Sequence, residues 1–160
     1  PEVVLKLSDM LDYLLYDCSA DKVLLTKEIT LIENYNYLQR VRFGHRLDIL
    51  FTKEGNFSDI KIAPMLLLPF VENSFKHGVG KDRKKSWIKM HLSSNKAQIL
   101  FSVKNSKGQE TGSINNDAQG GIGLPNVEKR LNLIYPKMHQ LAISDNPTSY
   151  DVILKINTLP

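Results

Sequence analysis

The sequence lacks three features that would place the protein outside the cell or across a membrane. It has a single cysteine, Cys18, so no disulfide bond can form within the chain, and a reducing compartment is expected. Its densest apolar run, residues 65–71, is far shorter than the roughly 18 apolar residues that a membrane-crossing helix needs. No secretory signal pattern follows Pro1, and a start without methionine is typical of a piece of a longer protein.

A surplus of charge of one sign is also missing. The 160 residues include 21 Lys and Arg against 17 Asp and Glu, which gives a net charge of +4. The concentrated basic run at residues 81–85 has no aromatic residues interleaved with it, unlike many nucleic-acid-binding surfaces. We therefore expect a solvated loop there, no nucleic-acid partner, and no direct contact of this chain with a membrane.

The composition suits one globular core with a small addition. Hydrophobic residues make up 42% of the chain and charged residues 24%. Apolar residues recur at helical spacing over residues 1–18, and a second helix is expected from Thr26 as N-cap to Phe43, with Gly44 ending it. Glu28 would favour the positive end of this second helix. The apolar faces of the two helices pack either on the domain itself or on the helices of a second protomer.

The stretch from Ala63 to Gly80, APMLLLPFVENSFKHGVG, carries polar residues at a spacing that suits a binding site. If Pro64 takes the first helical position and Gly78 follows the helix end, the stretch is one helix that turns about 100° per residue. Pro69 then lies inside this helix and is expected to kink it. Four polar side chains share one arc, opposite an apolar face: Glu72, Asn73, Lys76 and His77.

This polar face has two interpretations. An amide oxygen is a suitable ligand for a hard cation such as Mg²⁺, and a neighbouring lysine can neutralise phosphate charge, so Asn73 and Lys76 would bind a metal–phosphate group. Alternatively, the face is an ordinary solvated stripe in which Glu72 and Lys76 form an i, i+4 pair worth about 0.2–0.5 kcal/mol. A second stretch favours the binding site.

That second stretch is GGIGLPNVEKRL, from Gly120 to Leu131. Gly121 and Gly123 allow the backbone to come close to a ligand. Pro125 is expected to begin a helix whose free N–H groups point at an anion bound there. The stretch therefore predicts a phosphate-binding site about 45 residues after the polar helix.

Together, LPFVENSFKHG and GIGLPNVEKRLNLIYP resemble the N box and the second glycine box of the ATP-binding domain of sensor histidine kinases, in the GHKL ATPase superfamily. The residues are most similar to those of the LytS-type subfamily, and the resemblance extends over nearly the whole chain. LSDMLDYLLYD and LTKEITLIENYNYLQRVRFGHRLDI resemble the region that follows the phosphoacceptor box. The resemblance thus implies that residues 1–43 belong to the dimerisation and phosphotransfer region and residues 44–160 to the catalytic domain.

The resemblance also implies a role for each residue of the two motifs. Asn73 would bind an Mg²⁺ ion that bridges the phosphates of ATP, Lys76 would contact phosphate, and His77 would support this contact. Glu72 would hold a metal-bound water or orient Asn73. The glycine stretch would complete the ATP site with six residues: Gly121, Ile122, Gly123, Leu124, Asn126 and Arg130.

Two positions depart from the family pattern. Asn105 stands where the family has an aspartate that accepts a hydrogen bond from the adenine amino group, and the next glycine comes one residue late. Asn105 is still expected to face adenine through its side-chain oxygen, with a loss of about 1 kcal/mol relative to a charged acceptor. Pro69 replaces the first asparagine of the N box. Residues 107–119, which have few apolar side chains, would form a mobile lid over ATP.

Alternating apolar and polar residues predict the strands. One strand is expected over residues 46–51, a hairpin over residues 87–103, and a terminal hairpin over residues 141–156. A helix from Pro125 to Ile134 precedes the terminal hairpin. Because helices alternate with strands and several strands come in hairpins, we expect an α/β two-layer sandwich with a mixed, mainly antiparallel sheet, preceded by a helical arm.

The expected function is that of the ATP-binding catalytic region of a two-component sensor histidine kinase. It would transfer the γ-phosphoryl group of ATP to a histidine upstream of this chain, for relay to a response regulator. No phosphoacceptor motif occurs here, and three histidines are expected to be structural or exposed: His45, His91 and His139. The full-length protein would be a membrane-anchored homodimer with this chain in the cytoplasm.

Two alternatives stay open at this point. The first is a degenerate kinase-like module that binds partners or nucleotide without turnover, which the asparagine at position 105 suggests. The second is an ATP-driven clamp of the same superfamily, which would use a glutamate four residues before Asn73. Pro69 occupies that place and argues against the clamp.

Overall fold

The computed structural model describes residues 1–78, 85–95, 97–107 and 123–158. The elements follow in this order: α1 (Glu2–Asp12), the π-helical turn η1 (Tyr13–Asp17), β1 (Val23–Leu24), α2 (Leu25–Phe43), the 3-10 turn η2 (Gly44–Arg46), β2 (Leu47–Gly55), β3 (Lys61–Ile62), α3 (Leu68–Gly78), β4 (Ser86–Asn95), β5 (Gln98–Ser106), α4 (Gly123–Ile134), β6 (His139–Asp145) and β7 (Ser149–Asn157).

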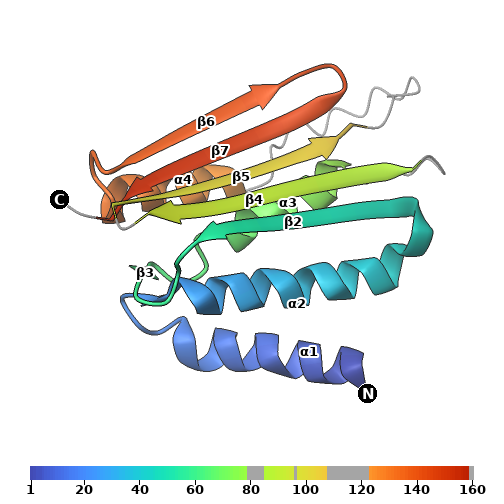
Figure 1. Cartoon of the computed structure of the whole chain (residues 1–160), viewed down its shortest axis with the longest axis horizontal. Coiled ribbons are helices and arrows are strands. Elements are labelled where there is room, and N and C mark those ends of the chain that lie inside the picture. Colours follow the sequence, from blue (N-terminus) through green and yellow to red (C-terminus); the bar gives the residue numbers. More distant parts are fainter. Residues whose placement is uncertain (79–84, 96, 108–122, 159–160) are drawn as a thin grey trace.

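Five strands form one sheet in the order β2-β4-β5-β7-β6 (Figure 1). β2 and β4 are parallel, whereas the remaining neighbours are antiparallel. β1 and β3 form a separate antiparallel pair. In Figure 1, α3 and α4 lie behind the sheet, and α1 and α2 lie below it. The predicted α/β architecture with a mixed, mainly antiparallel sheet is confirmed.

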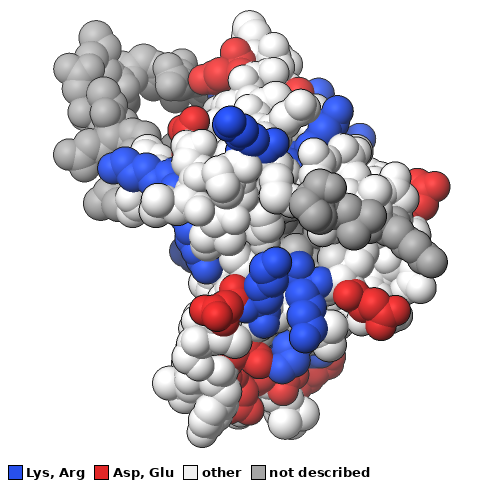
Figure 2. Space-filling view, turned by 90° about the vertical axis from the view of Figure 1, so that its left-hand side faces the viewer, with Lys and Arg blue, Asp and Glu red and all other residues white. Residues whose placement is uncertain are grey.

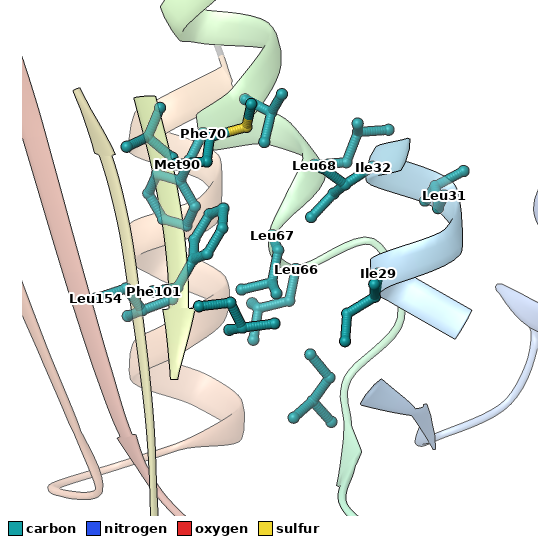
Figure 3. Packing of buried hydrophobic residues seen from close by; sticks show 14 of the residues in the cluster. Ile29, Leu31, Ile32, Leu66, Leu67, Leu68, Phe70, Met90, Phe101 and Leu154 are labelled. Atoms are coloured by element: carbon teal, nitrogen blue, oxygen red, sulfur yellow. The ribbon is translucent and has the colours of Figure 1, made fainter. Parts of the chain in front are cut away.

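The strands alternate between a buried and a solvent-facing side, as a sheet covered on one face requires. On β4, Ile88 and Met90 are buried while Lys89 between them is exposed. Phe101 on β5 and Leu154 on β7 are partners across the sheet and face the same core. In Figure 3, Met90 and Phe101 lie close to Phe70 of α3, with Leu154 beside Phe101.

Helix α2 belongs to the same core. Its residues Leu25, Ile29 and Ile32 are buried, and Figure 3 shows Ile29 and Ile32 close to the leucines at the start of α3. The boundary predicted after residue 43 therefore runs between two elements of one core, and it stays a prediction. In α1, by contrast, no residue is buried.

Two predicted helix starts are wrong by one or more residues. α2 begins at Leu25, and its N-cap is Leu24 instead of Thr26. The reason is non-local: β1 pairs with β3, and the N–H of Leu25 donates to Ile60 O at 2.7 Å, so the chain enters the helix directly from a strand. α4 begins at Gly123 instead of Pro125. The predicted end of α2 is confirmed, because Gly44 takes a φ of 56°.

The single helix predicted from Pro64 to Gly78 is also wrong. α3 begins only at Leu68, after a turn in which Met65 has a φ of 55°. Pro69 therefore lies in the first helical turn, where a missing N–H removes no helical hydrogen bond, and the predicted kink does not arise. Gly78 is the last residue of the helix instead of the residue after it.

Charges of both signs are mixed on the surface seen in Figure 2, as the small net charge suggests. There, Lys and Arg side chains gather between groups of acidic side chains. Lys85, the described residue of the basic run, pairs with Asp48 at 2.8 Å on the surface. Among the helices of the described ranges, none is long and apolar enough to pass through a membrane.

Candidate functional site

The polar face predicted for α3 exists. Glu72, Lys76 and His77 are exposed and Asn73 is half-buried. The opposite face is buried and includes Val71 and Phe75. The helical period therefore separates the candidate site residues from the core, as the sequence indicates.

Asn105 lies beyond the end of this polar face, at the last turn of α3. It is 0% exposed on β5, and its Nδ2 donates to Ser106 O at 2.9 Å. Its Oδ1 is buried and has no hydrogen-bond partner among the described residues. An unpaired buried oxygen of this kind costs about 1–3 kcal/mol, which a ligand that donates a hydrogen bond would recover. The residue therefore fits the expected acceptor for an adenine amino group.

Gly78 makes the contact between α3 and β5. A Cβ atom on this glycine would lie 2.8 Å from the Cβ and 2.9 Å from the Nδ2 of Asn105. Such distances are too short for any side chain, so only glycine lets the end of the helix touch the asparagine. The KHG sequence at the end of α3 is thus in direct contact with Asn105.

An aromatic ring and charged groups of both signs surround His77. Its ring centroid is 6.5 Å from that of Tyr150 on β7, and Tyr150 is the cross-strand partner of Asn105. Burial, and then the charges of Lys76 and Lys107, lowers the pKa of His77, whereas the charge of Asp145 acts in the opposite direction. His77 is therefore a neutral donor or acceptor near cations, which suits a site for phosphate.

Tyr150 lies beside the site although no sequence pattern marks it, and Lys107 is the first residue of the predicted lid. Lys107 follows β5 and forms an ion pair with Asp145 at the end of β6. Burial and then the charge of Asp145 raise the pKa of Tyr150. Both residues reach the site through the pairing of β5 with β7 and of β7 with β6, and no local pattern indicates such pairings.

The other side of the polar face meets α2. Tyr35 packs edge-to-face on Phe75 with ring centroids 5.3 Å apart. Burial and the nearby Glu72 carboxylate raise the pKa of Tyr35 to about 12. Burial also raises the pKa of Glu72. The Glu72 carboxyl therefore lies near Tyr35, on the side of α3 that faces α2.

Helix α4 packs against α3 and begins within the glycine stretch, at Gly123. Gly123 is its first residue, Leu124 is half-buried and Asn126 is exposed. Arg130 donates from Nη1 to Met65 O at 3.3 Å, so it also ties α4 to the start of α3. Gly121, Ile122 and most of the predicted lid lie outside the described residues.

A divalent metal would find few ligands on the protein itself. Within the described ranges, no group of three or more His, Cys, Asp and Glu side chains is arranged to hold a metal ion. Asn73 and Glu72 offer an amide and a carboxylate oxygen on adjacent positions of α3. Mg²⁺ commonly takes only one or two protein ligands and completes its shell with phosphates and water, so this pair fits a nucleotide-bound Mg²⁺.

The remaining histidines have other surroundings, as expected. The Nδ1 of His91 lies 2.9 Å from Oγ1 of Thr52, and the Nδ1 of His139 lies 2.8 Å from Tyr135 O. His45 is exposed in the turn η2. The prediction that these three are structural or exposed is confirmed.

Comparison with known proteins relates this chain to histidine kinases. Residues 1–47 match the family model described as histidine kinase. An uncharacterized sensor-like histidine kinase of Staphylococcus epidermidis is 34% identical over 98 residues, which is 61% of this chain and 19% of that protein. The first three curated relatives are matched over only 39%, 19% and 22% of their length.

Solved structures agree on the fold. The catalytic domain of the histidine kinase ThkA superposes with a TM-score of 0.59 at 16% identity, over 87% of this chain and 97% of that domain. ThkA in complex with the response regulator protein TrrA gives a TM-score of 0.58 at 13% identity, over 98% of this chain and 48% of the ThkA chain. The chain is thus related to histidine kinases in sequence, and its sheet and helices have the fold of their catalytic domains.

Proposed function

We propose that this chain is the ATP-binding catalytic region of a two-component sensor histidine kinase of the LytS-type subfamily. The observation that carries the proposal is the unpaired Oδ1 of Asn105, buried against Gly78 at the end of a helix with a polar face. Adenine would bind at Asn105. The phosphates would lie between the polar face of α3 and the N-terminus of α4, where backbone N–H groups favour anions.

The residues of this site would act by positioning ATP and by neutralising its charge, which is most of what phosphoryl transfer requires. Mg²⁺, when bound, supplies charge neutralisation on the phosphates. Asn73 would hold the metal, with Glu72 beside it, and Lys76 would contact phosphate directly. His77, which stays neutral because its pKa is lowered, would support phosphate by a hydrogen bond. Gly121, Ile122, Gly123, Leu124, Asn126 and Arg130 would line the site from the α4 side.

The γ-phosphoryl group would pass to a histidine outside this chain and then to a response regulator. ThkA, which has the same fold, forms a complex with the response regulator protein TrrA, and this complex supports such a partner. The full-length protein would be anchored in a membrane, with this chain in the cytoplasm.

The N-terminal helix would pair with a second protomer. Residues 1–43 would then belong to the dimerisation and phosphotransfer region, with α2 also packed on the catalytic core. Support comes from the apolar side chains that α1 and η1 leave at least 40% exposed: Val3, Val4, Leu5, Leu7, Leu11, Leu14, Leu15 and Tyr16. An exposed apolar surface of this kind is typical of a protein interface.

Calorimetric titration with a non-hydrolysable ATP analogue tests the nucleotide site. The wild-type chain should bind the analogue in a manner that depends on Mg²⁺, and Asn73→Ala should remove that dependence. Asn132→Ala is the matched control, because Asn132 is an exposed helical asparagine on α4. Absence of binding by the wild-type chain at millimolar nucleotide would contradict the proposal.

A further inference from the structure

A buried carboxylate lies at the junction of the N-terminal helix, α2 and α3. Glu28 is 0% exposed on α2. It accepts hydrogen bonds from the hydroxyl of Tyr13 and from three successive backbone N–H groups, those of Met65 at 2.7 Å, Leu66 at 3.2 Å and Leu67 at 3.1 Å. Glu28, whose position predicts an interaction with the start of α2, thus accepts hydrogen bonds from the turn before α3 instead.

These three N–H groups belong to the turn that leads directly into α3. The N–H groups at a helix start have no helical partner, and the helix dipole favours a negative charge there. A buried carboxylate is costly unless its oxygens are matched by donors. Glu28 and the turn at residues 65–67 therefore satisfy one another, and each depends on the other for its position.

The turn itself is strained and is held from two sides. Met65 has a φ of 55°, a region that costs a bulky residue about 1–2 kcal/mol. Its N–H is bound by Glu28 on α2, and its carbonyl accepts the hydrogen bond from Arg130 on α4. The N–H of Ala63 donates to the hydroxyl of Tyr135 at 2.8 Å. The start of α3 is thus fixed by partners outside its own helix.

Tyr13 connects this junction to the N-terminal helix. Within residues 2–17 it is the one side chain that is buried. Its hydroxyl donates to Glu28 and lies 3.3 Å from the Met65 N–H, for which it is a second acceptor. Burial and the neighbouring Glu28 raise the pKa of Tyr13, so the hydroxyl keeps its proton and stays a donor at physiological pH.

We infer that Glu28 is a positioning residue of the nucleotide site and that Tyr13 makes its position depend on the N-terminal helix. A movement of α1 that withdraws the Tyr13 hydroxyl removes one partner from Glu28 and weakens its hold on the strained turn at Met65. The start of α3 then shifts, and the polar face that carries Asn73 shifts with it. The part of this inference that concerns nucleotide rests on the proposed function.

Tyr13→Phe tests the link, because it removes the hydroxyl and keeps the ring. Tyr16→Phe is the matched control: Tyr16 lies in the same π-helical turn and is 74% exposed. Amide hydrogen exchange measured by NMR reports the state of the turn. Tyr13→Phe should speed the exchange of the Met65, Leu66 and Leu67 amides about tenfold, because losing a hydrogen bond to a charged group weakens the site by about that factor. The Phe101 amide in the central sheet should be unaffected, which shows that the fold is intact.

Affinity for the Mg²⁺-bound ATP analogue tests the positioning role. Tyr13→Phe should weaken binding several-fold, Glu28→Gln should weaken it more, and the double variant should bind like Glu28→Gln alone, because the tyrosine acts through the glutamate. Faster exchange with unchanged affinity would overturn the positioning role. Equal effects of Tyr13→Phe and Tyr16→Phe on both measurements would overturn the link.

The two measurements keep this inference apart from the proposed function. If the wild-type chain binds no nucleotide, the proposed function fails and the positioning role fails with it. The exchange rates of the three amides still decide whether Tyr13 and Glu28 hold the turn. If the wild-type chain binds nucleotide and Tyr13→Phe changes neither exchange nor affinity, the inference alone is overturned.

Discussion

The contact between Gly78 and Asn105 allows a quantitative prediction for Gly78→Ala. The added Cβ would lie 2.8 Å from the Asn105 Cβ and 3.0 Å from its Cγ. Carbon atoms normally approach to about 3.5–4.0 Å, so one of the two elements must move by roughly 0.5–1 Å. Overpacking of a closed contact costs about 1–3 kcal/mol. We expect the free energy of unfolding to fall by that amount.

The same displacement should weaken nucleotide binding. The Asn105 oxygen would leave the position from which it meets adenine, and a hydrogen bond of this kind is worth about 0.5–1.5 kcal/mol. The dissociation constant for an ATP analogue should therefore rise about 2- to 13-fold. Affinity for inorganic tripolyphosphate, which has no adenine, should change much less. Urea denaturation and fluorescence titration measure the two effects.

Gly44→Ala is the control for a loss of stability at a glycine that does not contact Asn105. A Cβ on Gly44 meets nothing within 4 Å, but its φ of 56° is strained for alanine. This variant should lose about 1–3 kcal/mol of stability and bind the ATP analogue as the wild-type chain does. If Gly78→Ala changes neither stability nor ATP affinity, or weakens tripolyphosphate and ATP equally, the assignment of Asn105 to adenine is refuted.

Three further predictions concern stability. Tyr135→Phe removes the acceptor of the buried Ala63 N–H and should cost about 1–3 kcal/mol in urea denaturation; a change below that of an exposed Tyr16→Phe variant would contradict the hydrogen bond. Phe101→Ala should lower the free energy of unfolding by about 3–5 kcal/mol, because Phe101 is 1% exposed in the centre of the core. A much smaller loss would mean that neighbouring side chains repack into the cavity. The pKa of His77 is lowered on folding, so the unfolded chain binds more protons, and the free energy of unfolding should rise with pH up to about 6.5. His77→Gln should flatten this rise. A pH profile of stability that is the same in the variant and the wild-type chain would contradict the lowered pKa.

Much of the fold follows from local sequence patterns. The alternation of Ile88, Lys89 and Met90 predicts a strand with one buried face, and the pattern of α3 separates Glu72, Lys76 and His77 from the core. Both periodicities are set by backbone geometry within a few residues. Gly44 also ends its helix as predicted, because only glycine adopts its conformation without strain.

The remaining features depend on partners that are distant in sequence. Thr26 would be a good N-cap, but the pairing of β1 with β3 starts the helix earlier. The position of Glu28 predicts an interaction with the start of its own helix, yet its hydrogen-bond partners are Tyr13 and the backbone of residues 65–67. Met65 takes a positive φ that no residue type signals, because contacts with α2 and α4 hold it there. Tertiary packing decides each of these positions, and local propensity is too weak to oppose it.

NMR titration with the Mg²⁺-bound ATP analogue is the decisive test of the ATP site, since it locates the ligand residue by residue. We expect the signals of the Asn105 side-chain amide and of the backbone amides from Glu72 to Gly78 to shift in a saturable manner. The signal of Trp87, on the opposite face of the sheet, should not shift. Shifts confined to other surfaces, or none at saturating nucleotide, would contradict the proposal that Asn105 and the polar face of α3 form an ATP site.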